Sequence, residues 1–155
     1  MQPSPARPEQ SFVEVLRQRR AELRESMSAL ELALASPIPE GQERWTERVH
    51  VALVELSADF REHIAITEGR AGLYHELLQT APRLSGAIAR LSREHAEITG
   101  LLDDLLDPAS TPTRTPDVDH IRDLGTALLG ALVRHRQRGS DLVYEAFQID
   151  IGGET

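Results

Sequence analysis

Residues 84–106 read LSGAIARLSREHAEITGLLDDLL, and this stretch decides the fold. Its apolar residues recur at alternating steps of four and three residues, as they do on one buried face of an α-helix. They are Leu84, Ile88, Leu91, Ile98, Leu102 and Leu105. His95 stands in this stripe where an apolar residue is due. The spacing therefore predicts a long amphipathic helix that turns one histidine toward the core.

Three further segments carry the same periodicity. One helix is expected from Ser11 to about Ala35, with Arg19 and Arg20 interrupting its stripe of Phe12, Leu16, Leu23, Met27, Leu30 and Leu34. A second, over residues 43–67, leads to His63 through Val49, Leu53, Leu56 and Phe60. A third begins near Asp117 and surrounds His135 with Leu124, Leu128, Leu132, Leu142, Ala146 and Ile149. Three of the four stripes thus contain a histidine.

Proline and glycine mark the connections between these helices. They stand in residues 36–42 and 107–116, and Gly69 and Gly72 are followed by a short helical piece, LYHELLQ. Thr80 is expected to cap the 84–106 helix, with Pro82 in its first turn. Four long helices with short links predict an all-α, antiparallel up-down four-helix bundle. We expect one bundle domain over residues 11–150, a disordered lead-in over 1–10 and a tail over 151–155.

Composition excludes several classes of function. The chain has no cysteine, which rules out disulfides, thiolate metal sites and cysteine nucleophiles. Its formal charge of −8 predicts no nucleic-acid partner, because phosphate contacts need a basic face. No run approaches the roughly 20 apolar residues of a membrane span, and no signal peptide opens the chain. A cytoplasmic protein is expected. All 17 basic residues are arginine, which suggests a GC-rich bacterial genome.

A four-helix pattern with inward histidines in REHIAIT, LSREHAEI and ALLGALVRHRQ resembles the hemerythrin-like (HHE cation-binding) family over nearly the whole chain. In that family two irons are held by a histidine on the first helix and a His-x-x-x-Glu on the second. The third helix supplies one histidine, or two spaced by four, and the fourth a histidine followed four or five residues later by a carboxylate. Residues four apart share a helix face, so each pair points into one cavity.

The resemblance implies that His63, His95 and His135 are metal ligands. The remaining ligand positions of the family are occupied here by Arg20, Thr67, Thr99 and Gly139 or Ser140. Glu68 and Asp141 each lie one residue beyond a carboxylate position, displaced by about 100° around the helix. Only a one-residue π-bulge would bring either back to the cavity. We therefore expect at most one Fe or Zn ion and no di-iron centre.

Arg20 and Asp59 are expected to complete a polar cluster in the core, with Arg19 as the alternative inward arginine. A guanidinium stays protonated and is not a ligand. Arg20 would instead pair with Glu68, Asp59 or Glu94, and Asp59, four residues before His63, would orient that imidazole. The remaining histidines are expected at the surface; they are His50, His75 and His120.

These features favour a binding or sensing module rather than an enzyme. An iron-dependent oxygen- or peroxide-handling protein is the first alternative, and it requires Glu68 and Asp141 to face inward. A metal-free interaction protein, whose histidines are hydrogen-bonded core residues, is the second. The end of the last helix is rich in apolar residues, among them Leu142, Val143 and Tyr144. It is expected to pack either on residues 69–79 or on a second subunit in a homodimer.

Overall fold

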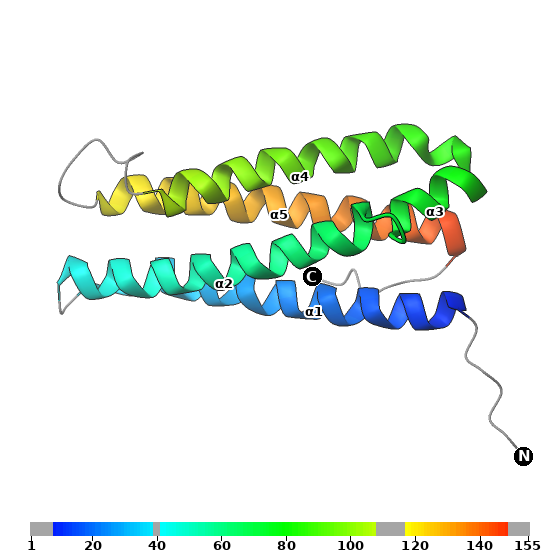
Figure 1. The fold of residues 1–155 in the computed structure, drawn as a ribbon. Coiled ribbons are helices and arrows are strands. Elements are labelled where there is room, and N and C mark those ends of the chain that lie inside the picture. The colour runs from blue at the N-terminus through cyan, green and yellow to red at the C-terminus, as the bar shows by residue number, and fades with distance from the viewer. Residues whose placement is uncertain (1–7, 39–40, 108–116, 149–155) are drawn as a thin grey trace, which may run out of the picture.

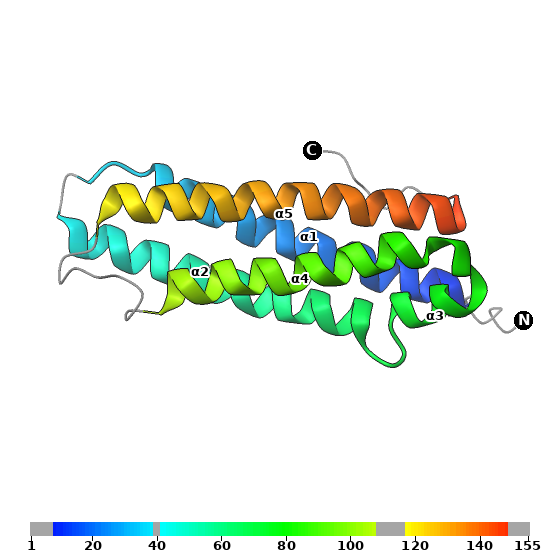
Figure 2. The ribbon, with the colours of Figure 1, turned by 90° about the horizontal axis from the view of Figure 1, so that it is seen from above.

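The computed structural model describes residues 8–38, 41–107 and 117–148, with side chains from Phe12 onward. Its helices are α1 (Pro8–Ala35), α2 (Gln42–Glu68), α3 (Leu73–Thr80), the 3-10 turn η1 (Pro82–Leu84), α4 (Ser85–Leu106) and α5 (Val118–Phe147). The four long helices lie side by side with neighbours antiparallel, and α3 covers one end (Figure 1, Figure 2). No strand occurs in the described ranges. The predicted all-α four-helix bundle is confirmed.

Local chemistry explains most helix ends. A side chain at Gly69 would place its Cβ 2.5 Å from the Ala65 carbonyl oxygen, so glycine permits the tight turn that ends α2. Asp117 caps α5 by accepting a hydrogen bond from the backbone N–H of His120. The start of α1 differs from the expectation, since it lies at Pro8 rather than Ser11. Proline is well suited to a first turn because its missing N–H is not needed there.

Thr80 does not cap the helix that follows it. Its hydroxyl donates instead to the Glu76 carbonyl oxygen inside α3 (3.0 Å), and the turn η1, beginning at Pro82, leads into α4. The predicted cap at Thr80 is therefore wrong, because a threonine hydroxyl can also be satisfied by the preceding turn of its own helix. The expected short helix after Gly72 is confirmed as α3.

The core consists of two apolar clusters. The first includes Leu23, Phe60, Ile98 and Leu132 and lies toward the α1–α2 and α4–α5 connections. The second includes Leu91 and, from α3 and the end of α5, Leu73, Tyr74, Leu77, Leu142 and Val143. The end of α5 therefore belongs to the same apolar cluster as α3 of its own chain. Between the clusters lies a buried polar layer formed by Arg20, His63, Thr67, His95, His135 and Ser140.

The end of the bundle away from α3 is held by close contact between α1 and α5. A Cβ at Gly125 would stand 2.5 Å from a methyl carbon of Leu34, so the two helices meet there without a side chain on α5. One turn earlier, Arg122 donates to the carbonyl oxygens of Leu34 (2.9 Å) and Ser36 (3.1 Å) and lies over the ring of Trp45. No helix in the described ranges is both long and apolar enough to cross a membrane.

Candidate metal centre

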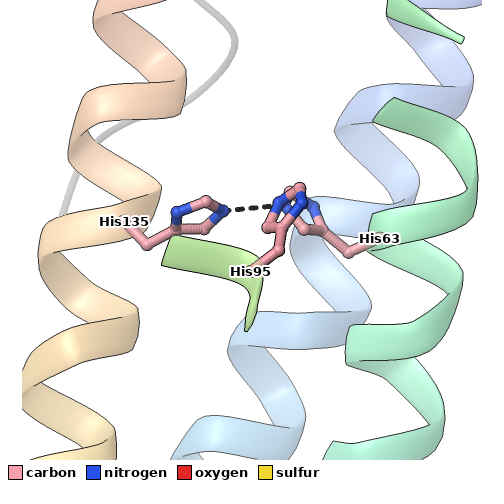
Figure 3. Close-up of side chains that lie close together, drawn as sticks. All are labelled: His63, His95 and His135. Carbon is pink, nitrogen blue, oxygen red and sulfur yellow. Dashed lines mark hydrogen bonds between the residues drawn. The ribbon is translucent and has the colours of Figure 1, made fainter. Parts of the chain in front are cut away.

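Three buried imidazoles meet in the polar layer, from α2, α4 and α5 (Figure 3). One ring nitrogen from each of His63, His95 and His135 lies within 4.8 Å of the corresponding atoms of the other two. The Nε2 atoms of His63 and His135 are 3.1 Å apart. The structure therefore places the three predicted histidines around one point. The other three histidines, His50, His75 and His120, are exposed as predicted.

Aromatic rings hold the cluster in position. Phe60, one turn before His63 on α2, stacks on that imidazole with ring centroids 5.7 Å apart. It also meets His95 and His135 edge-on. From the other side, the ring of Tyr74 on α3 stacks on His95 with centroids 5.8 Å apart. Burial raises the pKa of the Tyr74 phenol, so the hydroxyl is neutral at pH 7. Rings packed on both sides leave the imidazoles little freedom to rotate.

A chain of hydrogen bonds fixes the proton positions on two of the rings. Glu94 lies on α4 beside His95, and its Oε1 atom is 2.9 Å from Nδ1 of His135. The carboxylate can only accept, so the imidazole donates its Nδ1–H and keeps a lone pair on Nε2. His63 must then donate Nε2–H to that lone pair. This leaves Nδ1 of His63 as a bare acceptor, with no hydrogen-bond partner in the described part of the chain.

Burial lowers the pKa of all three histidines. It is the main cause of the lowering for His63, whose pKa falls well below 6.5, with repulsion by His135, His95 and Arg20 adding to it. Burial and His135 lower the pKa of His95 to about 4, against the opposing effect of Glu68. The pKa of His135 is lowered by burial despite its bond to Glu94. At neutral pH the cluster therefore offers neutral imidazoles, the form that binds metal ions.

Of the three histidines, His95 has the fewest hydrogen bonds to its ring nitrogens. Its side chain is only 2% exposed, and neither ring nitrogen has a hydrogen-bond partner within the described ranges. The Nδ1 atom lies 3.4 Å from Oε2 of Glu68, whose side chain is one-third exposed at the end of α2. A buried polar atom without a partner costs about 1–3 kcal/mol. A cation at the centre of the cluster would give one of these nitrogens a partner.

Arg20 closes the fourth side of the layer from α1. Its side chain is 4% exposed, whereas the competing Arg19 pairs with Glu22 nearer the surface (3.1 Å). The Arg20 guanidinium donates to Ser140 Oγ (3.1 Å) and to the Arg136 carbonyl oxygen (3.4 Å). A Cβ at Gly139 would stand 3.6 Å from Nη1, at ordinary van der Waals distance, so the arginine packs against α5 at this residue.

Of the carboxylates expected near the histidines, only Glu68 lies close to one of them. Glu68 reaches His95 at 3.4 Å, but Asp141 is exposed on a regular α-helix and accepts a hydrogen bond from Gln137 (3.0 Å). Asp59 accepts a hydrogen bond from Ser26 on α1, a partner other than the expected His63. Thr67 is buried and donates to the His63 carbonyl oxygen (2.8 Å).

The arrangement of buried histidines on an antiparallel bundle agrees with a family model. Residues 11–147 match the model of the hemerythrin HHE cation-binding domain. The chain belongs to this family. Comparisons with curated proteins and with solved structures gave no match. Membership in the hemerythrin family identifies the chain as a cation-binding bundle, and the three buried histidines are the residues that could hold an ion.

Two residues that contact the histidine cluster were not identified from the sequence, Glu94 and Tyr74. Glu94 was considered only as a partner for Arg20, yet it orients His135 and also pairs with Arg138. The signal was its place one residue before His95, because a rotation of about 100° turns that position toward the neighbouring helix. Tyr74 was missed because no periodicity relates a short separate helix to the stripe that it covers.

Proposed function

We propose that this hemerythrin-family bundle is a binding or sensing module that holds a single divalent metal ion on His63, His95 and His135. The observation that carries the proposal is the convergence of three neutral, buried imidazoles, with both nitrogens of His95 lacking a partner in the described residues. Nitrogen ligands of this kind suit zinc or ferrous iron. A bound ion of this type supplies Lewis acidity or, for iron, redox chemistry at an open coordination position.

The distances support a mononuclear site. Three nitrogens bound tetrahedrally to zinc at about 2.1 Å lie about 3.4 Å from one another. The Nε2 atoms of His63 and His135 are already 3.1 Å apart, and every pair of ligand atoms lies within 4.8 Å. His63 would move its proton from Nε2 to Nδ1, while His135 already presents a lone pair. Glu94 would keep His135 in that form, as carboxylates next to metal-bound histidines commonly do.

We infer that a second metal ion does not fit this donor set. Two irons need bridging carboxylates to offset their charge in a low-dielectric interior. Thr67 and Ser140 occupy the family's carboxylate positions, and the Ser140 hydroxyl already accepts from Arg20. The guanidinium adds a fixed positive charge that repels further cations. Asp141 faces solvent, which also disfavours the oxygen- or peroxide-handling alternative.

Elemental analysis of protein purified without an affinity tag tests the proposal. We expect one zinc or iron per chain. After removal with a chelator, titration with Co²⁺ should restore one ion and give the visible bands of a low-coordinate cobalt site. His95→Ala should abolish binding. The matched control is His50→Ala, which removes an exposed histidine of α2 and should leave the stoichiometry unchanged.

Two results would overturn the mononuclear site. Two irons per chain with near-ultraviolet charge-transfer bands would establish an oxo-bridged pair. No metal in either preparation, with unchanged helical circular dichroism in His95→Ala, would leave a metal-free interaction protein. The Glu94–His135–His63 hydrogen bonds are the observation that favours this second candidate, since they satisfy both nitrogens of His135 and Nε2 of His63 without an ion.

We also propose that a homodimer forms through the outer face of the end of α5. Leu142 and Val143 point into the bundle, whereas Tyr144 is 54% exposed beside them. Tyrosine is enriched at protein interfaces because it combines a large apolar ring with a hydroxyl.

A further inference from the structure

The outside of the bundle carries a polar groove between α4 and α5, two helices that lie side by side in both views (Figure 1, Figure 2). It has a volume of about 320 Å³. Its charged lining consists of Arg90, Arg93, Glu94, Glu97, Arg134 and Arg138. A second hollow shares Arg90 and Arg138 and continues along the same two helices toward the end of α5. This second hollow is also lined by Asp141 and Glu145, so the positive groove is confined to the first hollow.

The charge of the groove is opposite to that of the chain. Four arginines face two glutamates, which gives a formal excess of two positive charges on a protein with a net charge of −8. The helical spacing produces this excess. On α4, Arg93 and Glu94 follow Arg90 by three and four residues and precede Glu97 by four and three, and Arg134 and Arg138 are one turn apart on α5. A groove walled on both sides by guanidinium groups concentrates anions.

Two of the four arginines have no internal partner. Arg93 and Arg134 are exposed and make no ion pair or hydrogen bond with the described residues. The other two are directed at one carboxylate: Arg138 contacts Glu94 Oε2 directly, and the Nε atom of Arg90 lies 3.9 Å from that same oxygen. Glu94 is 13% exposed and therefore stands between the groove and the core.

We propose that this groove binds a small phosphate-bearing anion. A phosphate group carries about −1.5 to −2 charges at pH 7, which matches the positive excess of the lining. Guanidinium groups bind phosphate through paired, charge-assisted hydrogen bonds, and the unpaired Arg93 and Arg134 can supply them. The chemistry is the same for inorganic phosphate and for a phosphomonoester, and the volume admits either.

The groove is joined to the buried histidines through Glu94. One oxygen of this carboxylate contacts Arg138 in the groove, and the other accepts the hydrogen bond from His135 Nδ1. A phosphate that draws Arg138 away leaves Glu94 a stronger acceptor for the imidazole. Phosphate binding therefore changes the hydrogen bond that orients His135. This effect exists in the metal-free protein and does not depend on the proposed cation.

Titration of chelator-treated protein with inorganic phosphate, followed by ³¹P line broadening and by the ¹⁵N signals of arginine Nε and histidine rings, tests the site. Chloride at matched ionic strength corrects for screening. We expect saturable binding, with shifts at Arg138 and His135. The double variant Arg93→Gln/Arg134→Gln should weaken binding by about tenfold or more, since two charge-assisted partners are lost. Arg48→Gln/Arg61→Gln, which removes two exposed arginines of α2, is the charge-matched control and should retain binding.

Glycerol phosphate distinguishes the two sources of the anion. Tighter binding than inorganic phosphate supports a phosphomonoester, and weaker binding supports the free ion. Equal loss in both double variants, or no saturation beyond the chloride effect, would overturn the site. An oligonucleotide that binds far more tightly than either small molecule would also overturn it, in favour of a polyanion surface. A bound phosphate that leaves the His135 ring signals unmoved would refute the link through Glu94. None of these outcomes depends on the metal content that tests the proposed function.

Discussion

The apolar clusters and the histidine layer between them both draw on the four long helices. They affect the stability of the fold in opposite ways. In the clusters, Leu23, Phe60 and Leu132 are 0–1% exposed and bury only carbon. In the layer, His63, His95 and Arg20 are buried almost as deeply, and their polar groups must find partners. Polar burial of this kind costs free energy unless each group is satisfied. The difference indicates that the clusters maintain the fold, whereas the layer holds the residues that could bind an ion at a cost in stability.

Loss of a cluster leucine should have the largest effect. Leu132→Ala in the first cluster and Leu91→Ala in the second should each cost about 2–5 kcal/mol, because both side chains are fully enclosed. Val133→Ala, next to Leu132 but 53% exposed, is the control and should change stability by at most about 0.5 kcal/mol. Urea unfolding followed by circular dichroism measures the difference. Values near zero for both leucines would mean that the two clusters do not hold the bundle together.

The layer should make stability depend on pH in the metal-free protein. Its histidines have folded pKa values below the ordinary value of 6.5, so between the two values the unfolded chain binds more protons. Stability is therefore complete above about pH 6.5 and declines as the pH falls toward 4. For His95, whose folded pKa is about 4, the loss reaches about 3 kcal/mol.

A single variant tests which groups make the free energy of unfolding depend on pH. His95→Leu should flatten the decline and be at least as stable as the parent at pH 7, because it removes two unsatisfied nitrogens. His50→Leu, at an exposed position of α2, should leave the slope intact. Chemical unfolding at several pH values in the presence of a chelator provides the measurement. An unchanged slope in His95→Leu would assign the pH dependence to the other two histidines or to groups outside the layer.

The smallest effect on stability is expected on the outer side of α5. Tyr144→Ser should change the free energy of unfolding by at most about 0.5 kcal/mol, since the side chain is largely exposed. It should nevertheless shift sedimentation from dimer to monomer, because the ring belongs to the proposed interface. Val51→Ser, at another exposed apolar position, is the control. Identical sedimentation of the parent and Tyr144→Ser would remove the dimer from this face.

Periodicity predicted what depends on one helix at a time. The inward stripes through Phe60, Leu91 and Leu132 and the surface placement of His50 follow from residue spacing alone, and the structure agrees. The start of α5 near Asp117 was also predicted from the sequence, and the structure places the cap at this residue. The wrong cap at Thr80 shows the limit of such signals, since one hydroxyl can either accept from a backbone N–H of the next helix or donate to a carbonyl of its own preceding turn. The number and type of helices were thus accessible, but some of their ends were not.

Contacts between helices were much less predictable. Asp59 and Glu94 are both one turn or less from a cluster histidine in sequence, yet only Glu94 bonds to an imidazole. The choice depends on how far each helix is rotated about its axis, which packing of all four helices sets together. The same holds for Arg20, whose observed hydrogen bonds go to Ser140 and to the Arg136 carbonyl on a helix more than 100 residues away in the chain.

The close contact of Gly125 with Leu34 influences the register of α5 along the bundle. Ten residues separate this glycine from His135, about 15 Å along the helix. A slip of one residue would move α5 by about 1.5 Å and turn it by about 100°, enough to carry the imidazole out of the layer. A side chain at this position would have to displace the Leu34 methyl groups, so the glycine favours this register over its neighbours. A glycine ten residues from His135 thus favours the register in which α5 presents that imidazole to the centre of the bundle.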